Sequence, residues 1–136
     1  MEIQIKETEL EKVWKLRNEV MYPEKDIDYV KLADDENGLH LGFYADDKLV
    51  SVISLFITEK NIQFRKFATL ADEQGKGYGT ILLNEVIDYA KRNNIKKIWC
   101  NSRAEKTDFY EKFGFKKTDK KYEESGRKFI IMEKIL

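Results

Sequence analysis

The sequence predicts an α/β domain in which a mixed, mostly antiparallel central sheet is flanked by helices in a three-layer arrangement. The middle of the chain carries three apolar, aromatic and β-branched runs joined by short polar connections. A glycine-rich loop then links the last run to the most regular amphipathic pattern in the sequence. The length of 136 residues fits one domain, so we assign residues 1–136 to a single unit.

The first forty residues predict one strand and two helices. Residues 3–5 alternate between apolar and polar side chains, as in a short strand. Residues 8–11 form a capping-box pattern for a helix whose apolar positions run from Leu10 to Met21. Pro23 prevents easy continuation of that helix, and Asp26 to Leu32 predict a second, shorter helix.

The central part predicts an antiparallel meander followed by a helix. The three runs span Leu39 to Tyr44, Leu49 to Ile57 and Ile62 to Leu70, and their short connections favour antiparallel pairing. Apolar residues at helical spacing then extend from Tyr78 to about Arg92.

The last third predicts a strand, a short helix and two further strands. The strand runs from Ile95 to Cys100, and the helix from Thr107 to Phe113 is closed by Gly114. The terminal strands begin at Phe115 and span Phe129 to Met132. We expect the latter to form an exposed sheet edge through which a homodimer would assemble.

Composition excludes several classes of protein. Lys and Arg number 25, as do Asp and Glu, so the net charge is zero, which disfavours a general binder of nucleic acid. The longest apolar run is far shorter than the roughly 20 residues that cross a bilayer, and the N-terminus lacks the order of a signal peptide. We therefore expect a cytoplasmic protein. With one cysteine, Cys100, and one histidine, His40, no Cys/His metal site can form.

The glycine loop is the most informative local feature. Gly75, Gly77 and Gly79 stand at alternate positions where a strand turns into the strong helix. Glycines let main-chain amides approach a ligand, and the free amides of a first helical turn attract anions, so a pyrophosphate fits here. The alternative is that the glycines merely permit a tight turn. Walker and dinucleotide motifs do not match, because Lys76 is followed by glycine and the glycine spacing differs.

The segment Gln74-Gly75-Lys76-Gly77-Tyr78-Gly79 resembles the signature of the GNAT superfamily of acyl-CoA-dependent N-acetyltransferases, Gln/Arg-x-x-Gly-x-Gly/Ala at the end of the fourth strand. The resemblance continues through residues 101–104 to residues 109–115, which look like the family's Phe-Tyr-x-x-x-Gly-Phe box. It covers the middle and latter half of the chain, whereas the first forty residues match only in their order of elements. A GNAT-like fold and transfer of an acetyl group from acetyl-CoA to an amine are what this resemblance implies.

The resemblance also implies roles for individual residues. Amides of residues 74–80 would hold the pyrophosphate of coenzyme A, main-chain groups of residues 67–69 would bond the pantetheine arm and supply an oxyanion donor, and Asn101 matches an asparagine that contacts the arm. Lys76 would pair with a phosphate or else remain a solvated surface lysine. The predicted cofactor site consists of Phe67, Ala68, Thr69, Gln74, Gly75, Lys76, Gly77, Tyr78, Gly79, Thr80 and Asn101.

Tyr110 is the one catalytic residue that the resemblance implies. It matches the family's tyrosine near the thioester sulfur, where a phenol would donate a proton to the departing thiolate. The alternative is a core tyrosine within an aromatic helix. No carboxylate or histidine stands out as a general base.

Charge is distributed unevenly along the chain. Residues 1–47 hold 6 basic and 13 acidic residues, whereas residues 91–128 hold 13 basic and 6 acidic ones. We expect the acidic part to attract a cationic amine acceptor, the alternative being that these residues only cover solvated helix faces. A rival interpretation of the whole chain is a non-catalytic acyl-CoA sensor or interaction module.

Overall fold

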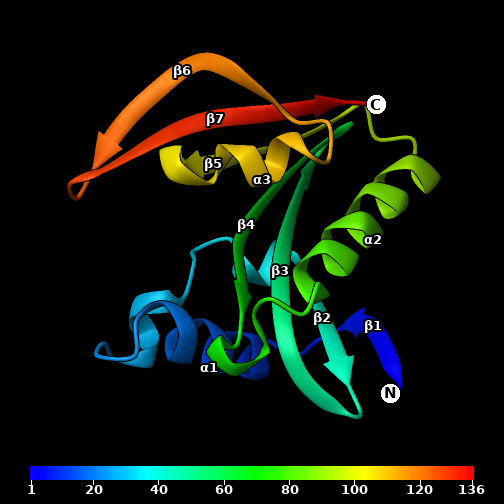
Figure 1. The fold of residues 1–136 in the computed structure, drawn as a ribbon, viewed down its shortest axis with the longest axis vertical. Coiled ribbons are helices and arrows are strands. Elements are labelled where there is room, and N and C mark those ends of the chain that lie inside the picture. Colours follow the sequence, from blue (N-terminus) through cyan, green and yellow to red (C-terminus); the bar gives the residue numbers. More distant parts are fainter.

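The computed structural model describes all residues from Met1 to Leu136. Seven strands, three α-helices and four 3₁₀ turns follow one another along the chain (Figure 1). In chain order they are β1 (Ile3–Glu7), α1 (Leu10–Met21), η1 (Ile27–Val30), η2 (Asp35–Asn37), β2 (Leu39–Ala45), β3 (Lys48–Thr58), β4 (Asn61–Thr69), η3 (Ala71–Glu73), α2 (Tyr78–Arg92), β5 (Lys97–Arg103), η4 (Ala104–Lys106), α3 (Thr107–Glu111), β6 (Lys116–Glu124) and β7 (Arg127–Ile135).

All seven strands belong to one sheet, in the order β1-β2-β3-β4-β5-β7-β6. Every neighbouring pair is antiparallel except β4 and β5, which are parallel. The predicted mixed, mostly antiparallel sheet and its central meander are therefore confirmed. None of the helices is long and apolar enough to cross a membrane.

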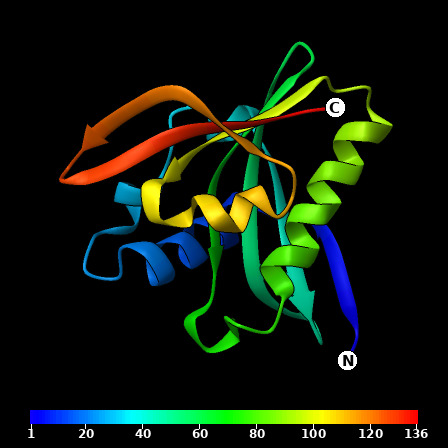
Figure 2. The same cartoon turned by 45° about the horizontal axis from the view of Figure 1, so that its top comes forward.

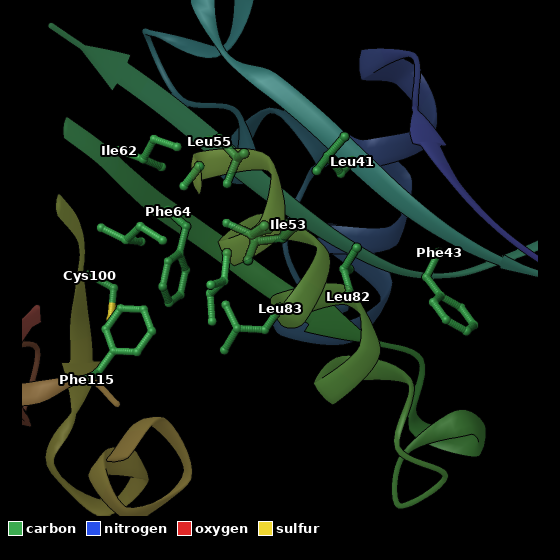
Figure 3. Packing of buried hydrophobic residues seen from close by; sticks show 14 of the residues in the cluster. Leu41, Phe43, Ile53, Leu55, Ile62, Phe64, Leu82, Leu83, Cys100 and Phe115 are labelled. Atoms are coloured by element: carbon green, nitrogen blue, oxygen red, sulfur yellow. The ribbon is translucent and has the colours of Figure 1, made fainter. Parts of the chain in front are cut away.

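Helices cover both faces of the sheet, which confirms the three-layer prediction. Figures 1 and 2 show α2 and α3 on one face and α1 on the other. The main core lies under α2, where Leu82 and Leu83 meet Ile53, Phe64 and Cys100 (Figure 3). The Cys100 thiol is thus packed within this core. A smaller cluster under α1 joins Val13, Leu16, Val52 and Ala68.

A buried ion pair attaches the α1 face to the sheet. The Arg17 side chain is fully buried and donates to both carboxylate oxygens of Asp35, at 2.8 and 2.9 Å. The same guanidinium also donates to the carbonyl of Val30 at 2.9 Å and to the Ser54 hydroxyl at 2.8 Å. His40 contacts Ser54 Oγ at 2.7 Å and the Asp35 carbonyl at 2.7 Å. One guanidinium therefore ties α1, both 3₁₀ turns around residues 27–37 and β3 together.

Hydrogen bonding controls the charge of Asp35. Burial alone would raise the pKa of this carboxyl, but hydrogen bonds from Arg17, the Leu32 amide and the Trp14 indole outweigh burial and lower the pKa from 3.8 to about 2. Asp35 therefore stays ionised opposite Arg17 at neutral pH.

The structure differs from two sequence predictions near the N-terminus. The capping box does not form: helix α1 begins after Glu9 without a side-chain cap, because the Thr8 hydroxyl bonds to the Tyr44 hydroxyl at 3.0 Å and the Lys6 carbonyl at 3.2 Å. The second, shorter helix predicted at residues 26–32 is present as the 3₁₀ helix η1, which covers only Ile27–Val30. The chain leaves the helical path there because the Val30 carbonyl and the Leu32 amide bond to the buried ion pair.

The predicted sheet edge at residues 129–132 is also wrong. These residues lie within β7, which pairs with β5 on one side and β6 on the other. The edges of the sheet are β1 and β6. Strand β7 therefore has no free edge for a partner chain.

Replacing Asp35 by Asn should lower the free energy of unfolding near pH 7 by about 3–5 kcal/mol, because Arg17 would stay buried without its counter-charge. Urea unfolding measures this change. The exposed neighbour Asp34→Asn is the control and should shift stability by no more than about 0.5 kcal/mol.

The same pair makes stability depend on acid. Because folding lowers the pKa of Asp35 from 3.8 to about 2, its contribution is fully present above pH 3.8 and is lost as the pH falls through 2. The stability gap between wild type and Asp35→Asn should thus shrink by roughly 2 kcal/mol across this interval. A gap of constant size at both ends of the interval would contradict this account.

Candidate functional site

The site forms where strands β4 and β5 separate. Only Asn61–Gln63 of β4 pair with Lys97–Trp99 of β5, after which the two strands diverge (Figure 1). The edge of β4 from Phe64 to Thr69 that faces β5 therefore has no strand beside it. Main-chain donors and acceptors along this edge are available to a ligand.

A bulge in β4 sets the direction of this open edge. The pairing with β3 slips between Val52 and Ser54, and Lys66 adopts a positive φ of 53°. Beyond the bulge the strand is held from the β3 side, because the Ser51 hydroxyl donates to the Ala68 carbonyl at 3.0 Å and lies 2.8 Å from the Thr69 hydroxyl. The predicted cofactor residues 67–69 thus lie together on the open edge.

The glycine loop follows directly after this edge. Gly75 and Gly77 have φ values of +80° and +84°, and a Cβ on either would meet nothing within 4 Å. Their glycine identity is therefore required by the backbone conformation, and the loop surface above them is open. The Gln74 side chain donates to the Thr69 carbonyl at 3.0 Å, and Lys76 forms an ion pair with Glu73 at 3.0 Å. The Gln74 contact ties the loop to the end of β4, whereas the Lys76–Glu73 pair lies within the segment after β4.

Gly79 has a different role. A Cβ at this position would lie 3.3 Å from the Phe67 ring. The third glycine thus allows helix α2 to approach strand β4 closely. The spacing of glycines in the sequence could not distinguish this packing role from a role in ligand binding.

The N-terminus of α2 is suited to an anion. Its N-cap is Gly77, which has no side chain to cap the helix, and the amides of Tyr78, Gly79 and Thr80 precede the first residues that can bond within the helix. These amides and the positive end of the helix dipole lie beside the open loop. The loop and helix start therefore fit the diphosphate of coenzyme A, and the structure brings together the predicted residues from Gln74 to Thr80.

A hollow of about 450 Å³ continues from this point between α2 and α3. It is lined by Thr80, Asn84, Ile87, Asp88, Lys91, Phe109, Lys112, Phe113 and Lys134. Its three lysines make it favourable for further phosphate groups. A larger hollow of about 630 Å³ lies between α1 and the β2–β3 turn, and it contains none of the predicted site residues.

Tyr110 projects from α3 toward the split. Its ring packs against Phe64, with centroids 5.6 Å apart, and against Phe115 at 6.1 Å. The hydroxyl bonds to no protein group, yet it is not among the fully enclosed polar atoms. Burial raises the pKa of Tyr110 well above its ordinary value of 10, with a smaller effect from Cys100 in the same direction and an opposing one from Arg103. The phenol is therefore neutral and has an unused donor.

Two other polar residues, Asn101 and His40, lie outside the hollow between α2 and α3. Asn101 is exposed in β5, and because its neighbour Cys100 points into the core under α2, strand alternation directs Asn101 to the opposite face. The Asn101 side chain thus lies on the face of the sheet opposite the core under α2, and its contact with the cofactor arm stays a prediction. His40 belongs to the buried Arg17 network on the α1 face.

A split parallel pair beside a glycine loop at an uncapped helix start is an arrangement that suits an acyltransferase with a phosphate-bearing acyl carrier. Comparison with known families agrees: the model described as "Acetyltransferase (GNAT) domain" matches residues 6–136. The chain belongs to the GNAT family and is an acyltransferase.

Individual relatives show the same relationship. The chain is 25% identical to the uncharacterized N-acetyltransferase YitI of Bacillus subtilis (strain 168), covering 98% of this chain and 97% of the relative. The crystal structure of a putative N-acetyltransferase from Lactobacillus plantarum superposes with a TM-score of 0.84 at 21% identity, covering 99% and 97% of the two chains. A GNAT family acetyltransferase from Elizabethkingia anophelis, solved with acetyl-CoA bound, has a TM-score of 0.76 at 19% identity over 98% of each chain. These superpositions show that the chain has the fold of these acetyltransferases.

Replacing Gly77 by Asp should raise the dissociation constant for coenzyme A at least about tenfold, because it places a carboxylate beside the diphosphate. Gly126→Asp is a matched control, since Gly126 also has a positive φ, +77°, and open space around it. Calorimetric titration with coenzyme A measures both variants. Equal affinity in the two, with both folded, would place the diphosphate elsewhere.

Proposed function

We propose that this protein transfers the acetyl group of acetyl-CoA to a primary amine of a small molecule, peptide or protein, by direct attack within a ternary complex. The observation that carries the proposal is the split between β4 and β5, which opens beside an anion-binding helix start. A thioester held along β4 would place its carbonyl within the split, where an amine can reach it. Such alignment is worth several kcal/mol of the barrier.

The cofactor's polar groups match the free main-chain groups of this face. Amides of residues 74–80 bind the diphosphate, and main-chain groups of Phe67 and Thr69 bond the pantetheine arm. An amide near Ala68 or Thr69 donates to the oxygen that becomes negative during transfer. Lys76 stays with Glu73 or exchanges this partner for a phosphate.

Direct attack is favoured because the site offers no activated protein nucleophile. Burial raises the pKa of the Cys100 thiol to about 12, so the thiol is neutral and a poor nucleophile. The amine lone pair therefore forms the new C–N bond with the thioester carbon. The C–S bond breaks, its electron pair leaves with sulfur, and the amine's surplus proton leaves for water or the thiolate.

Tyr110 stabilises the leaving sulfur as a hydrogen-bond donor. The pKa of this buried phenol is raised, whereas an alkyl thiol titrates near 8.5, so complete proton transfer from phenol to thiolate is uphill. A hydrogen bond from the neutral phenol still offsets the charge that develops on sulfur.

Replacing Tyr110 by Phe should keep the aromatic packing and lower kcat at least about tenfold, because the leaving thiolate loses its donor. Tyr89→Phe, in the half-buried face of α2, is the control and should retain the wild-type rate. Release of free thiol at saturating acetyl-CoA measures both. An undiminished rate for Tyr110→Phe across the pH range would make this residue structural only.

The proposal as a whole is tested by pairing two measurements on the wild-type protein. Coenzyme A binding is measured by calorimetry, and thiol release is measured with a panel of primary amines. Amine-dependent thiol release is the expected result. Tight cofactor binding with no amine-dependent release by any acceptor would instead identify a sensor of acyl-CoA.

A further inference from the structure

We propose that the acceptor is an amine that also carries a carboxylate, and that Arg65, Lys66 and Arg103 hold this carboxylate on the α1 side of the split. The inference rests on the proposed acetyl transfer and specifies its second substrate. It depends on three features: the direction of these side chains, their lack of partners, and the aromatic rings around them.

The bulge in β4 turns two successive basic side chains to the same face. Phe64 and Phe67 both pack into the core under α2, with ring centroids 6.3 Å apart. Between them, Lys66 reaches the other face, where its Nζ lies 5.5 Å from the centre of the Tyr22 ring at the end of α1. Arg65, one residue after Phe64 in regular strand geometry, points to this same face.

Arg103 approaches from the other strand of the split. It is the last residue of β5, and it alternates with Cys100 and Ser102, which are buried. Strand alternation therefore directs it away from Ser102 and toward the α1 side. The electrostatics agree: burial lowers the pKa of Lys66, and the positive charges of Arg65, Arg17 and Arg103 lower it further, opposed only by Asp35.

No protein carboxylate neutralises these three groups. Arg65, Lys66 and Arg103 are half-buried, yet none takes part in any of the ion pairs of the structure. Asp35, whose charge acts on Lys66, is held by both oxygens to Arg17. A partly dehydrated cluster of positive charge without a partner binds an anion favourably, and guanidinium forks fit a carboxylate well.

Aromatic rings stand beside this cluster. Tyr122 and Phe129 of the β6–β7 hairpin stack with centroids 5.1 Å apart and 13° between planes. Phe129 lies opposite Arg103 in the β5–β7 pair and opposite Tyr122 in the β6–β7 pair, which places both rings on the face that carries Arg103. On the α1 side, Tyr22 and Tyr29 meet edge to face at 4.8 Å. These rings offer flat apolar contacts for the carbon skeleton of an acceptor.

Positive charge at the acceptor side also serves the chemistry. It attracts a carboxylate and disfavours the ammonium form of the amine, so a larger share of bound acceptor has the free lone pair that attack requires. This argument replaces the expectation of a cationic acceptor. Of the acidic residues in the first part of the chain, Asp35 is already paired with Arg17.

Matched acceptors test the inference directly. Thiol release is measured with glycine, alanine, phenylalanine and glutamate, each against its carboxamide, at saturating acetyl-CoA. The amino acids should show a kcat/KM at least about tenfold above their carboxamides, mainly through KM. Equal or better use of the carboxamides, or a preference for O-phosphoethanolamine over every amino acid, would overturn the proposal.

Variants that each remove one positive charge test which residues bind the carboxylate of the acceptor. Lys66→Gln and Arg65→Gln should bring the ratio between amino acid and carboxamide toward one, while the dissociation constant for acetyl-CoA stays at the wild-type value. Lys60→Gln, an exposed lysine in the turn before β4, is the control and should keep the wild-type ratio. A ratio that survives both Lys66→Gln and Arg65→Gln would place the carboxylate elsewhere.

A binding experiment separates this inference from the proposed activity. N-acetylglycine and N-acetylglycinamide are titrated calorimetrically into the protein saturated with coenzyme A. Tighter binding of N-acetylglycine that is lost in Lys66→Gln supports the carboxylate site, even if no acceptor in the panel is turned over. Equal binding of the two compounds contradicts the site, even if acetyl transfer itself is observed.

Discussion

The early separation of β4 from β5 is the constraint on which the rest of the molecule depends. Three paired residues hold the two strands side by side, and the unpaired remainder of β4 supplies the main-chain groups of the site. The bulge at Lys66 sets the direction of the side chains of β4. It places the aromatic side chains in the core and the basic ones on the opposite face. One irregular strand thus serves both faces of the sheet.

The α1 face is held by charge as much as by apolar contact. Val13 and Leu16 of α1 are buried in the small cluster on β3 and β4, and Val20 and Met21 pack against it. Arg17 adds a polar bridge between α1, the following turns and β3. The Asp35 carboxylate offsets the free-energy cost of burying the positive charge of Arg17. The contacts of Arg17 fix the position of Tyr22 at the end of α1. Tyr22 in turn forms one wall of the acceptor side that we propose.

Sequence patterns predicted most of the fold because periodicity and glycine placement act locally. The meander, the long helix and the glycine loop all follow from neighbouring residues. The capping box failed because Thr8 bonds to a distant tyrosine, and the second helix is reduced to a 3₁₀ helix because Val30 and Leu32 bond to a buried ion pair. The basic cluster could not be foreseen, since no sequence rule places a lysine at positive φ or turns residues 65, 66 and 103 to one face of the sheet.

The split also affects how the molecule holds together. Strands β1–β4 form one half of the sheet and β5–β7 the other, and the seam between them has three matched positions, against seven between β5 and β7. A thioester lying in that gap would bond to one half and pack against the other, and would therefore connect the two halves while it is bound. The enzyme without cofactor would then be the more flexible form. In each catalytic cycle the two halves of the sheet would be held together more firmly while the thioester is bound and less firmly after its release.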